Sequence, residues 1–453
     1  MKPRPPFPAT ASRRQAIAAL AASGLAASAR PLFGQSRELR APDEDGARRK
    51  NILLTGCRHD INIGDQAHAP GMLQLIRTHL PGVEATLWPM PSRYGPATAD
   101  HPGRRRRLKP ELAEMMRRSF PGLRILEPDW ASEDGDPDAA AELADAISRA
   151  DLLISGSGGG IKTAARNWKE DTGKPWGAYG VTLGSVQTWY SEASFLFCRD
   201  IPSVRILDAG GLAGPGFAFG PDSTFAMDLR DEERALAFLG NHGLEDRRFL
   251  CVVPRLRHSP YPEIYGYAPS PEEKEKAATN ERFKETDHAA VRELIVAWVR
   301  RTGMKVLACP EMTYGVPLAK EQWVDPLPED VRSHVVWRDS FWLCDEAASV
   351  FARAFAMVSL DCHSPILALA AGTPAIHLRL PTDNPSKSRM FADIGLPEWV
   401  AENDATSGGD LVQLLGAIAE DPAAATLKVQ RAMAFVRERQ RETMATVRDV
   451  LWG

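Results

Sequence analysis

The sequence predicts an α/β fold made of two domains, each built around a parallel sheet, that face each other across a cleft. Short apolar runs alternate with helical patterns from residue 50 onward, and a second block of this kind begins near residue 249. Such alternation is typical of parallel sheets covered by helices. The chain has 453 residues, more than one domain usually holds. Parallel sheets bind ligands beyond the carboxyl ends of their strands, which places a site between the domains.

The first block follows a Rossmann-like order of strand, helix and strand. Continuous apolar runs indicate buried strands, and amphipathic stretches between them indicate helices. The predicted strands are 51–55, 84–88, 123–126, 151–155 and 175–181, and the predicted helices are 66–79, 110–119 and 137–149.

The second block repeats this order. The segment 258–285 is rich in Pro, Tyr and Glu and follows neither period, so we interpret it as an inserted excursion that could act as a lid. The tail 421–451 has a long, charged helical pattern. The predicted strands are 249–254, 304–309, 334–337, 356–360 and 374–378, and the predicted helices are 286–302, 344–353, 364–371 and 410–419.

The expected domain organisation follows from these blocks. We expect a signal peptide at 1–29, a linker at 30–48, an N-terminal Rossmann-like domain at 49–235, a C-terminal Rossmann-like domain at 236–405 with the insert 258–285, and C-terminal helices at 406–453 that pack back.

The N-terminus resembles a twin-arginine export signal. Residues 12–29, SRRQAIAALAASGLAASA, combine paired arginines, an Ala-rich stretch and an Ala-Ser-Ala cleavage site. Ala16 stands where a bulky apolar residue is usual, so an ordinary secretory signal or a disordered N-terminus stays open. No later segment reaches about 18 uninterrupted apolar residues, so we expect a soluble mature protein without a membrane span. The protein would be exported or periplasmic if the twin-arginine signal is genuine, and cytoplasmic if it is not.

Charge and cysteine content exclude some functions. A net charge of −4 gives no pull toward nucleic acid, and the basic cluster Arg104–Arg107 is interpreted as a solvated loop. None of the six cysteines forms a C-x-x-C pair, which argues against a zinc or thioredoxin-type motif. Cys198, Cys251 and Cys309 lie in apolar runs as small hydrophobic residues, while disulfides stay open.

Two glycine-containing turns follow strands and could bind an anion. After the first strand, Asn62 and Gly64 would form a tight turn, and Asp65 would cap a helix whose free N–H groups point at the ligand. The alternative is that they only form the turn and the cap. Gly158, Gly159 and Gly160 follow another strand, where backbone N–H groups can converge on negative charge. This stretch matches neither a P-loop nor G-x-G-x-x-G, and a flexible turn is the alternative.

Basic residues gather after several strands. Arg255, Arg257 and His258 follow the strand at 249–254, where guanidinium groups suit a carboxylate or phosphate, although surface ion pairs remain an alternative. Further cations expected at the cleft are Arg199, Lys387 and Arg389.

His363 and Ser364 open a helix directly after a strand. A helix N-terminus at the cleft would favour the neutral form of His363. A structural histidine is the alternative.

Together these motifs resemble the polysaccharide pyruvyl transferase family. They occur in the family's order between about residues 50 and 400, each loosely and the ordered set more specifically. They are Asn62-Ile63-Gly64-Asp65, Gly158-Gly159-Gly160, Tyr179 to Gly184, Arg199-Asp200 with Ser203, His363-Ser364 to Gly372 and Pro374, Lys387, and Phe391 to Gly395.

The resemblance implies a GT-B-like transferase. Such an enzyme would transfer a pyruvyl group from phosphoenolpyruvate to a glycan sugar as a ketal, in exopolysaccharide biosynthesis at the cell envelope. It would need no metal and no other cofactor. His363 would be the acid/base, with Arg255 beside it as a second catalytic residue, and Arg255, Arg257, Lys387 and Arg199 would bind the donor's charge.

Two departures leave other functions open. Asp361 stands where the family has Arg, and would repel an anionic donor unless it is paired. Phosphoenolpyruvate is a cytoplasmic metabolite, which fits poorly with export. One alternative is an exported, non-catalytic or repurposed member that binds an envelope glycan. The other is a glycosyltransferase-type enzyme on the same fold. The acceptor sugar and the oligomeric state are not predicted.

Overall fold

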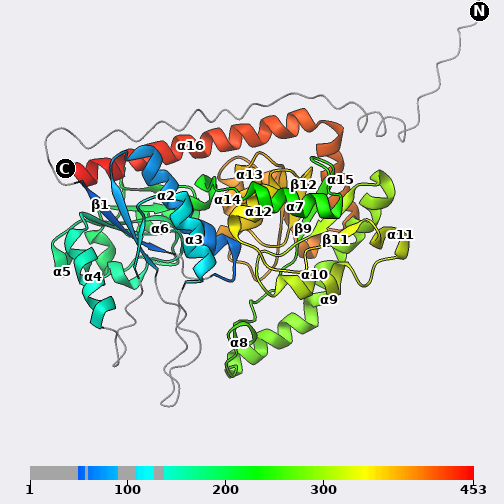
Figure 1. Cartoon of the computed structure of the whole chain (residues 1–453), viewed down its shortest axis with the longest axis horizontal. Helices are drawn as coiled ribbons and strands as arrows, with labels where there is room; N and C mark the ends of the chain where they lie inside the picture. Colours follow the sequence, from blue (N-terminus) through cyan, green and yellow to red (C-terminus); the bar gives the residue numbers. More distant parts are fainter. Residues whose placement is uncertain (1–48, 57–59, 90–107, 127–136) are drawn as a thin grey trace, which may run out of the picture. The chain divides into compact units, whose positions relative to one another are not determined.

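The computed structural model describes residues 49–56, 60–89, 108–126 and 137–453 (Figure 1). The expected signal at 1–29, the linker at 30–48, Cys57 and Arg104–Arg107 lie outside the described residues.

The first sheet is parallel throughout and has eight strands within the described residues. Its order is β3-β2-β1-β4-β6-β7-β8, and the short β5 pairs with β6. Burial of every residue in β1 and β4 explains their continuous apolar sequences, because helices cover both faces of such a sheet. The strands are β1 Asn51–Gly56, β2 Glu84–Pro89, β3 Arg124–Ile125, β4 Leu152–Ser155, β5 Gly158–Gly159, β6 Trp176–Thr182, β7 Phe195–Cys198 and β8 Phe217–Phe219.

The second sheet is also parallel, with six strands in the order β11-β10-β9-β12-β13-β14. In both sheets the order reverses beside the first strand, between β1 and β4 and between β9 and β12. Such reversal points leave a crevice at the carboxyl ends of the strands. The strands are β9 Phe249–Val253, β10 Lys305–Ala308, β11 Val335–Trp337, β12 Ala356–Ser359, β13 Ala375–Arg379 and β14 Val400–Glu402.

The helices alternate with the strands. All those predicted are present, and shorter ones that the sequence did not indicate join them. The α-helices are α2 Ile63–His79, α3 Pro110–Ser119, α4 Pro137–Arg149, α5 Trp168–Thr172, α6 Ile201–Ala209, α7 Glu232–His242, α8 Tyr261–Tyr265, α9 Pro271–Thr302, α10 Gly315–Trp323, α11 Glu329–Arg332, α12 Cys344–Phe351, α13 His363–Ala370, α14 Pro385–Ala392, α15 Gly408–Glu420 and α16 Pro422–Trp452.

Two local predictions were wrong. Helix α2 begins at Ile63, and its cap is Asn62 instead of Asp65, because the Asn62 side chain accepts hydrogen bonds from the backbone N–H groups of Gly64 and Asp65. The segment 258–285 is not a single irregular excursion. Ser270 and Glu273 form a capping box that starts the 32-residue helix α9, so only the stretch before it, with the short α8, is irregular.

Helix α16 contacts the part of the protein built around the first sheet and the part built around the second. It packs against α15 and α13 at one end and against α2 and β7 at the other (Figure 1). The Tyr179 hydroxyl lies 2.9 Å from the Thr443 hydroxyl, and Arg439 donates to the carbonyl of Phe219. These contacts tie α16 to β6 and β8. The described residues belong to one compact unit, Pro42–Gly453, and none of their helices is long and apolar enough to cross a membrane.

Candidate functional site

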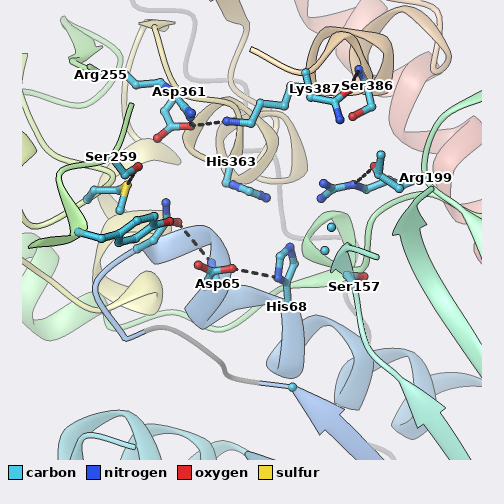
Figure 2. Close-up of a pocket in the computed structure, with 18 of the residues that line it drawn as sticks. Asp65, His68, Ser157, Arg199, Arg255, Ser259, Asp361, His363, Ser386 and Lys387 are labelled. Atoms are coloured by element: carbon cyan, nitrogen blue, oxygen red, sulfur yellow. Dashed lines mark hydrogen bonds and ion pairs between the residues drawn. The ribbon is translucent and has the colours of Figure 1, made fainter. Parts of the chain in front are cut away.

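A pocket of about 350 Å³ lies where strands of both sheets end (Figure 2). Eight of the residues predicted for the site line it, namely Asn62, Asp65, Gly158, Gly159, Arg199, Arg255, His363 and Lys387. The other lining residues were not predicted, and they are Gly56, His68, Ser157, Lys162, Thr182, Ser259, Tyr261, Met312, Asp361, Asn384 and Ser386.

The start of α2 does not offer free N–H groups to a ligand. The Asn62 carboxamide oxygen accepts from Gly64 N at 2.6 Å and Asp65 N at 3.3 Å. The N–H of Ile63 donates to the carbonyl of Glu311, which belongs to the loop after β10. The expected anion site at this helix end is therefore wrong, because the chain itself satisfies these donors.

His363 is the first residue of α13, and the buried carboxylate of Glu311 caps this helix. Glu311 accepts from the backbone N–H groups of His363 and Ser364 and from the Ser364 hydroxyl, at 3.1, 2.6 and 2.8 Å to Oε2. Its Oε1 lies 3.2 Å from Nδ1 of His363. The imidazole is thus fixed through Nδ1, while Nε2 is buried without a hydrogen-bond partner among the described residues.

This environment reverses the expected charge of His363. Burial alone would lower its pKa, but the contacts of Nδ1 with the Cys362 sulfur and the Glu311 carboxylate raise the pKa well above the usual imidazole value. The expectation of a neutral His363 was wrong, because the Glu311 carboxylate neutralises the helix N-terminus that would have favoured the neutral form. His363 can therefore donate a proton from Nε2.

Gly64 serves packing against His363, not a turn. It lies within α2, and a Cβ at this position would lie 2.2 Å from Cγ of His363. Gly64 does not line the pocket, but its missing side chain lets α2 approach the histidine closely.

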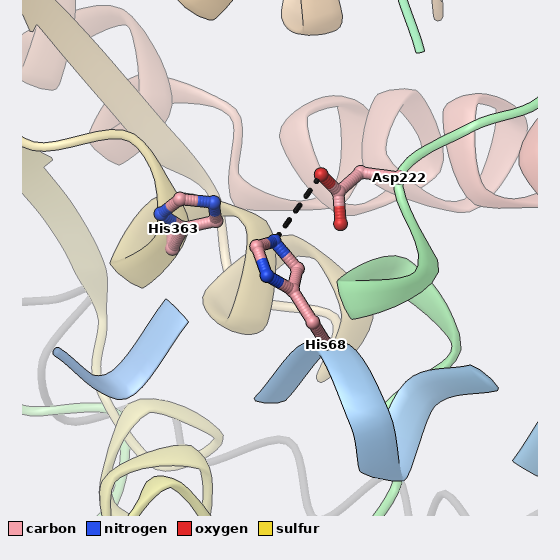
Figure 3. Close-up of side chains that lie close together, drawn as sticks. All are labelled: His68, Asp222 and His363. Atoms are coloured by element: carbon pink, nitrogen blue, oxygen red, sulfur yellow. Dashed lines mark ion pairs between the residues drawn. The ribbon is translucent and has the colours of Figure 1, made fainter. Parts of the chain in front are cut away.

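A second histidine, His68 of α2, faces His363 across the pocket (Figure 3). The ring centroids are 5.1 Å apart and nearly perpendicular. Nε2 of His68 lies 3.5 Å from Oδ2 of Asp222, and Nδ1 lies 3.7 Å from Oδ1 of Asp65. Burial lowers the pKa of His68 in spite of Asp222, so this imidazole is neutral at neutral pH.

Arg199 is held in place by the same buried carboxylate. Its Nη1 donates to Asp222 at 2.7 Å, and its Nε donates to the Thr182 hydroxyl at 2.8 Å. The other oxygen of Asp222 accepts from the backbone N–H and hydroxyl of Thr224. Burial opposes charge on Asp222, yet His68 and Arg199 hold its pKa well below the usual value.

The opposite wall pairs two cations with two carboxylates. Arg255 binds Asp361, and its Nη2 lies 3.2 Å from Asp383. Nζ of Lys387 lies 3.3 Å from Asp383 and 3.8 Å from Asp361. Burial opposes ionisation of Asp361, but Arg255 and Lys387 lower its pKa. Asp361, the departure from the family pattern, is therefore paired.

The glycine-rich turn contributes Gly158 and Gly159, which form β5. Gly158 adopts a φ of +130°, open mainly to glycine, and Ser157 before it donates to the carbonyl of Tyr179 at 3.1 Å. Gly160 has a φ of +73° and lies outside the pocket lining. The turn is thus built into the first sheet beside the pocket.

Several predicted site residues lie elsewhere. Arg257 makes a bidentate ion pair with Asp287 and stacks on Phe283, so it packs against the middle of α9. His258 is held through its backbone by the Asn280 side chain. Three more lie outside the pocket lining, namely Gly64, Ser364 and Arg389.

Two clusters bring three possible metal ligands within 4.8 Å of one another. They are His68, Asp222 and His363, and Glu311, Cys362 and His363. Both oxygens of Asp222 are occupied by Arg199 and Thr224, and Glu311 caps α13, so these carboxylates already have hydrogen-bond partners. The five cysteines of the described residues are buried thiols that form no disulfide with one another, namely Cys198, Cys251, Cys309, Cys344 and Cys362.

Two parallel α/β sheets with a polar pocket at their carboxyl ends define a GT-B-like protein. The polysaccharide pyruvyl transferase pattern matches residues 62–380, and the chain belongs to this family. This membership supports a polysaccharide-modifying enzyme. No curated protein matches the chain significantly.

Solved structures support the same fold. The UDP-GlcNAc 2-epimerase from Neisseria meningitidis bound to UDP-GlcNAc has a TM-score of 0.51 at 10% identity, over 89% of this chain and 99% of that one. The UDP-GlcNAc 2-epimerase from Methanocaldococcus jannaschii has a TM-score of 0.50 at 11% identity, over 89% and 100%. The S. aureus MnaA–UDP structure has a TM-score of 0.50 at 11% identity, over 88% and 95%.

Proposed function

We propose that the protein transfers a pyruvyl group from phosphoenolpyruvate to a sugar of an envelope glycan, forming a ketal. The observation that carries this proposal is the partly buried His363, whose Nε2 is unpartnered among the described residues and whose pKa is raised, within the pocket of a chain of this family. Ketal formation from an enol phosphate requires an acid that protonates the methylene carbon.

The pocket lining suits a donor that carries both phosphate and carboxylate. It contains four cations, Lys162, Arg199, Arg255 and Lys387, and two carboxylates, Asp65 and Asp361. Arg255 and Lys387 share Asp361 and Asp383, so their positive charge is largely compensated. Arg199, which Asp222 holds, and Lys162 lie on the side of the first sheet, so the donor's charge can be contacted from both walls of the pocket.

The chemistry balances with these groups. The first sugar hydroxyl bonds to C2 of phosphoenolpyruvate while C3 takes a proton from His363. The second hydroxyl then displaces phosphate, which leaves with the electron pair of its bond to C2. Of the two hydroxyl protons, one replaces the proton given to C3 and the other leaves with phosphate. No metal ion or further cofactor is required.

The first experiment is a thermal-shift titration of the full chain with phosphoenolpyruvate. A ligand that binds only the folded state raises the melting temperature as its concentration passes Kd. We expect a saturable shift that Lys387→Ala weakens, whereas Arg389→Ala, in the same helix but outside the pocket lining, leaves it unchanged. The absence of any shift up to millimolar concentration would contradict phosphoenolpyruvate as the donor.

A second candidate function is glycan binding by an exported, repurposed member. It is favoured by Asp361 and Asp383, which compensate the charges of Arg255 and Lys387. Under this alternative, the wild-type protein shows no thermal shift with phosphoenolpyruvate, and Asp361→Asn binds it more tightly than wild type does. If wild type binds the donor and Asp361→Asn changes its Kd by less than twofold, Asp361 does not oppose the donor. A parallel titration with UDP, the ligand named for the S. aureus structure, tests the glycosyltransferase alternative.

Export is a separate part of the proposal. It rests on the paired arginines and the Ala27-Ser28-Ala29 site, outside the described residues. Cell fractionation with mass spectrometry of the N-terminus should find a chain that begins at residue 30 outside the cytoplasm. A full-length chain confined to the cytoplasm would refute export and remove the conflict with a cytoplasmic donor.

A further inference from the structure

His68 is the second histidine that lines the pocket, and the pyruvyl transfer described above gives it no role. It comes from the first sheet's half, on α2, whereas His363 comes from the second, on α13. The two rings are 5.1 Å apart. Gly64 makes this approach possible, since any side chain there would collide with His363.

The two histidines have related surroundings, and Figure 3 shows the contact of His68 with Asp222. In each, one ring nitrogen faces a fully buried carboxylate. Nδ1 of His363 faces Glu311 at 3.2 Å, and Nε2 of His68 faces Asp222 at 3.5 Å. The other nitrogen of His363, Nε2, has no hydrogen-bond partner among the described residues, whereas Nδ1 of His68 lies 3.7 Å from Asp65, a carboxylate that also lines the pocket. The contact of His68 with Asp222 is longer than that of His363 with Glu311 and does not meet hydrogen-bond geometry in this structure, but such contacts often tighten when substrate binds.

We infer that His68 is the general base of the pyruvyl transfer, with Nδ1 accepting the proton of the attacking sugar hydroxyl, and that Asp222 positions it by holding Nε2–H. This inference rests on the proposed function. His363 then serves as the acid at C3 and, once deprotonated, accepts the proton of the second hydroxyl. The proton on His68 leaves with the departing phosphate, so both imidazoles return to their starting states.

The directions of the two pKa shifts agree with His68 as the base and His363 as the acid. Burial lowers the pKa of His68, which keeps the base neutral, while Cys362 and Glu311 outweigh burial and raise the pKa of His363, which keeps the acid charged. Two groups whose pKa values are pushed apart within one site mark an acid and a base.

Several charged or titratable groups surround the His68 imidazole. Asp65 on its own helix lies 3.7 Å from Nδ1, and Asp222 lies at Nε2. His363 of α13 opposes protonation of His68. Lys162 and the His68 ring both lie close to Gly158 of the glycine-rich turn. A Cβ added to Gly158 would lie 3.5 Å from Nζ of Lys162 and 3.8 Å from Cε1 of His68. Arg199 shares the Asp222 carboxylate.

A metal site is the competing interpretation of this cluster. The hydrogen bonds of Asp222 argue against a metal site. Arg199 occupies one of its oxygens at 2.7 Å, and Thr224 occupies the other with two hydrogen bonds. A guanidinium on the same carboxylate would also repel a divalent cation.

The first test determines the protonation states of His68 and His363 by NMR. In the full chain labelled with ¹⁵N-histidine, His68→Asn and His363→Asn assign the two ring signals. We expect His68 to be neutral at pH 7 with its proton on Nε2, and His363 to be charged. A His68 protonated on Nδ1, or charged at pH 7, would overturn the inference whatever the substrate. A melting temperature that rises with Zn²⁺ in wild type but not in His68→Asn would overturn it in favour of a metal site.

The second test measures turnover of phosphoenolpyruvate by phosphate release and ketal mass, with a panel of 4-nitrophenyl hexosides as acceptors. His68→Asn should lower kcat by about 100-fold or more, the usual loss of a general base. It should lower kcat far more than it raises the donor KM, because Arg199 shares Asp222 with His68, and it should remove the fall of kcat on the acid side of the profile. His79→Asn, in the same helix but outside the pocket lining, is the control and should behave as wild type.

The two proposals fail in different ways. If wild type releases phosphate and His68→Asn does so equally fast, the base assignment is wrong while the transferase stands. If wild type forms no ketal with any acceptor of the panel, the proposed function fails and the base assignment fails with it.

Discussion

Replacing Glu311 by Gln should change the stability of the protein in a pH-dependent way. The buried carboxylate accepts from two backbone N–H groups, from the Ser364 hydroxyl and from Nδ1 of His363. Gln keeps one acceptor oxygen, but its NH₂ group must face a donor, either the N–H groups at the start of α13 or the charged imidazole. The substitution therefore removes a charge and creates an unfavourable contact between donors.

The expected loss follows from these contacts. A hydrogen bond to a charged group contributes about 1.5–3 kcal/mol and a neutral one about 0.5–1.5 kcal/mol. Because the contacts form one network and do not add, we expect a total loss of roughly 2–4 kcal/mol at pH 5.5. The loss should be smaller at alkaline pH.

The sign follows from linkage. The folded pKa of His363 is raised above its unfolded value, so its stabilisation is complete below about pH 6.5 and disappears as the pH rises through the folded pKa. In Glu311→Gln the raised pKa falls, so the difference from wild type is largest in acid. Guanidinium unfolding at pH 5.5, 7 and 9, with a ¹⁵N titration of His363, measures both effects.

Glu346→Gln is the matched control. Glu346 is also a buried carboxylate, paired with Arg338 at 2.9 Å, but it does not line the pocket. It should cost stability without moving the pKa of His363. An equal loss at every pH in Glu311→Gln, with the His363 titration unchanged, would refute a contribution of Glu311, beside Cys362, to the raised pKa of this histidine.

Two further predictions concern packing and the acceptor. Gly64→Ala should displace His363 and destabilise the fold by about 1–3 kcal/mol, as overpacking does, whereas Gly159→Ala, which meets no atom within 4 Å of its added Cβ, should be neutral in thermal unfolding. A folded Gly64→Ala with wild-type stability would show that α2 can move away. Tyr261→Ala removes the aromatic ring that α8 brings to the pocket and should raise the acceptor KM more than the donor KM, since such rings stack on sugars. An unchanged acceptor KM would separate α8 from acceptor binding.

Much of the fold could be predicted because it depends on local sequence. Strands such as β1, β4 and β9 are buried on both faces, so their apolar runs are unmistakable. The strands β5, β7, β8 and β14 were missed, although β4, β11 and β12 are about as short and were predicted, so a run of two to four residues is not a dependable signal. The family's ordered motifs also identified the family, which the match over 62–380 confirms.

The partners of the site residues could not be predicted, because they are far away in the sequence. Glu311 lies 52 residues before His363, and Asp361 lies 106 residues after Arg255. A sequence shows that a cation is present, but not which carboxylate the fold places beside it. The signal that could have indicated His68 is its position three residues after Asp65, on the face of α2 that carries Gly64 toward the cleft.

These distant partners change how the pocket can bind charge. Both helix N-termini that the sequence aimed at a ligand are capped by the chain itself, α2 by Asn62 and α13 by Glu311. Recognition of an anionic donor must then come from side chains, above all Arg199, which Asp222 holds at the edge of the pocket. Asp222 also contacts His68, so removing either Arg199 or His68 would disturb the other through their shared carboxylate. Under the proposed function we therefore expect donor binding and proton transfer to be coupled, and double-mutant cycles between His68 and Arg199 should give non-additive losses.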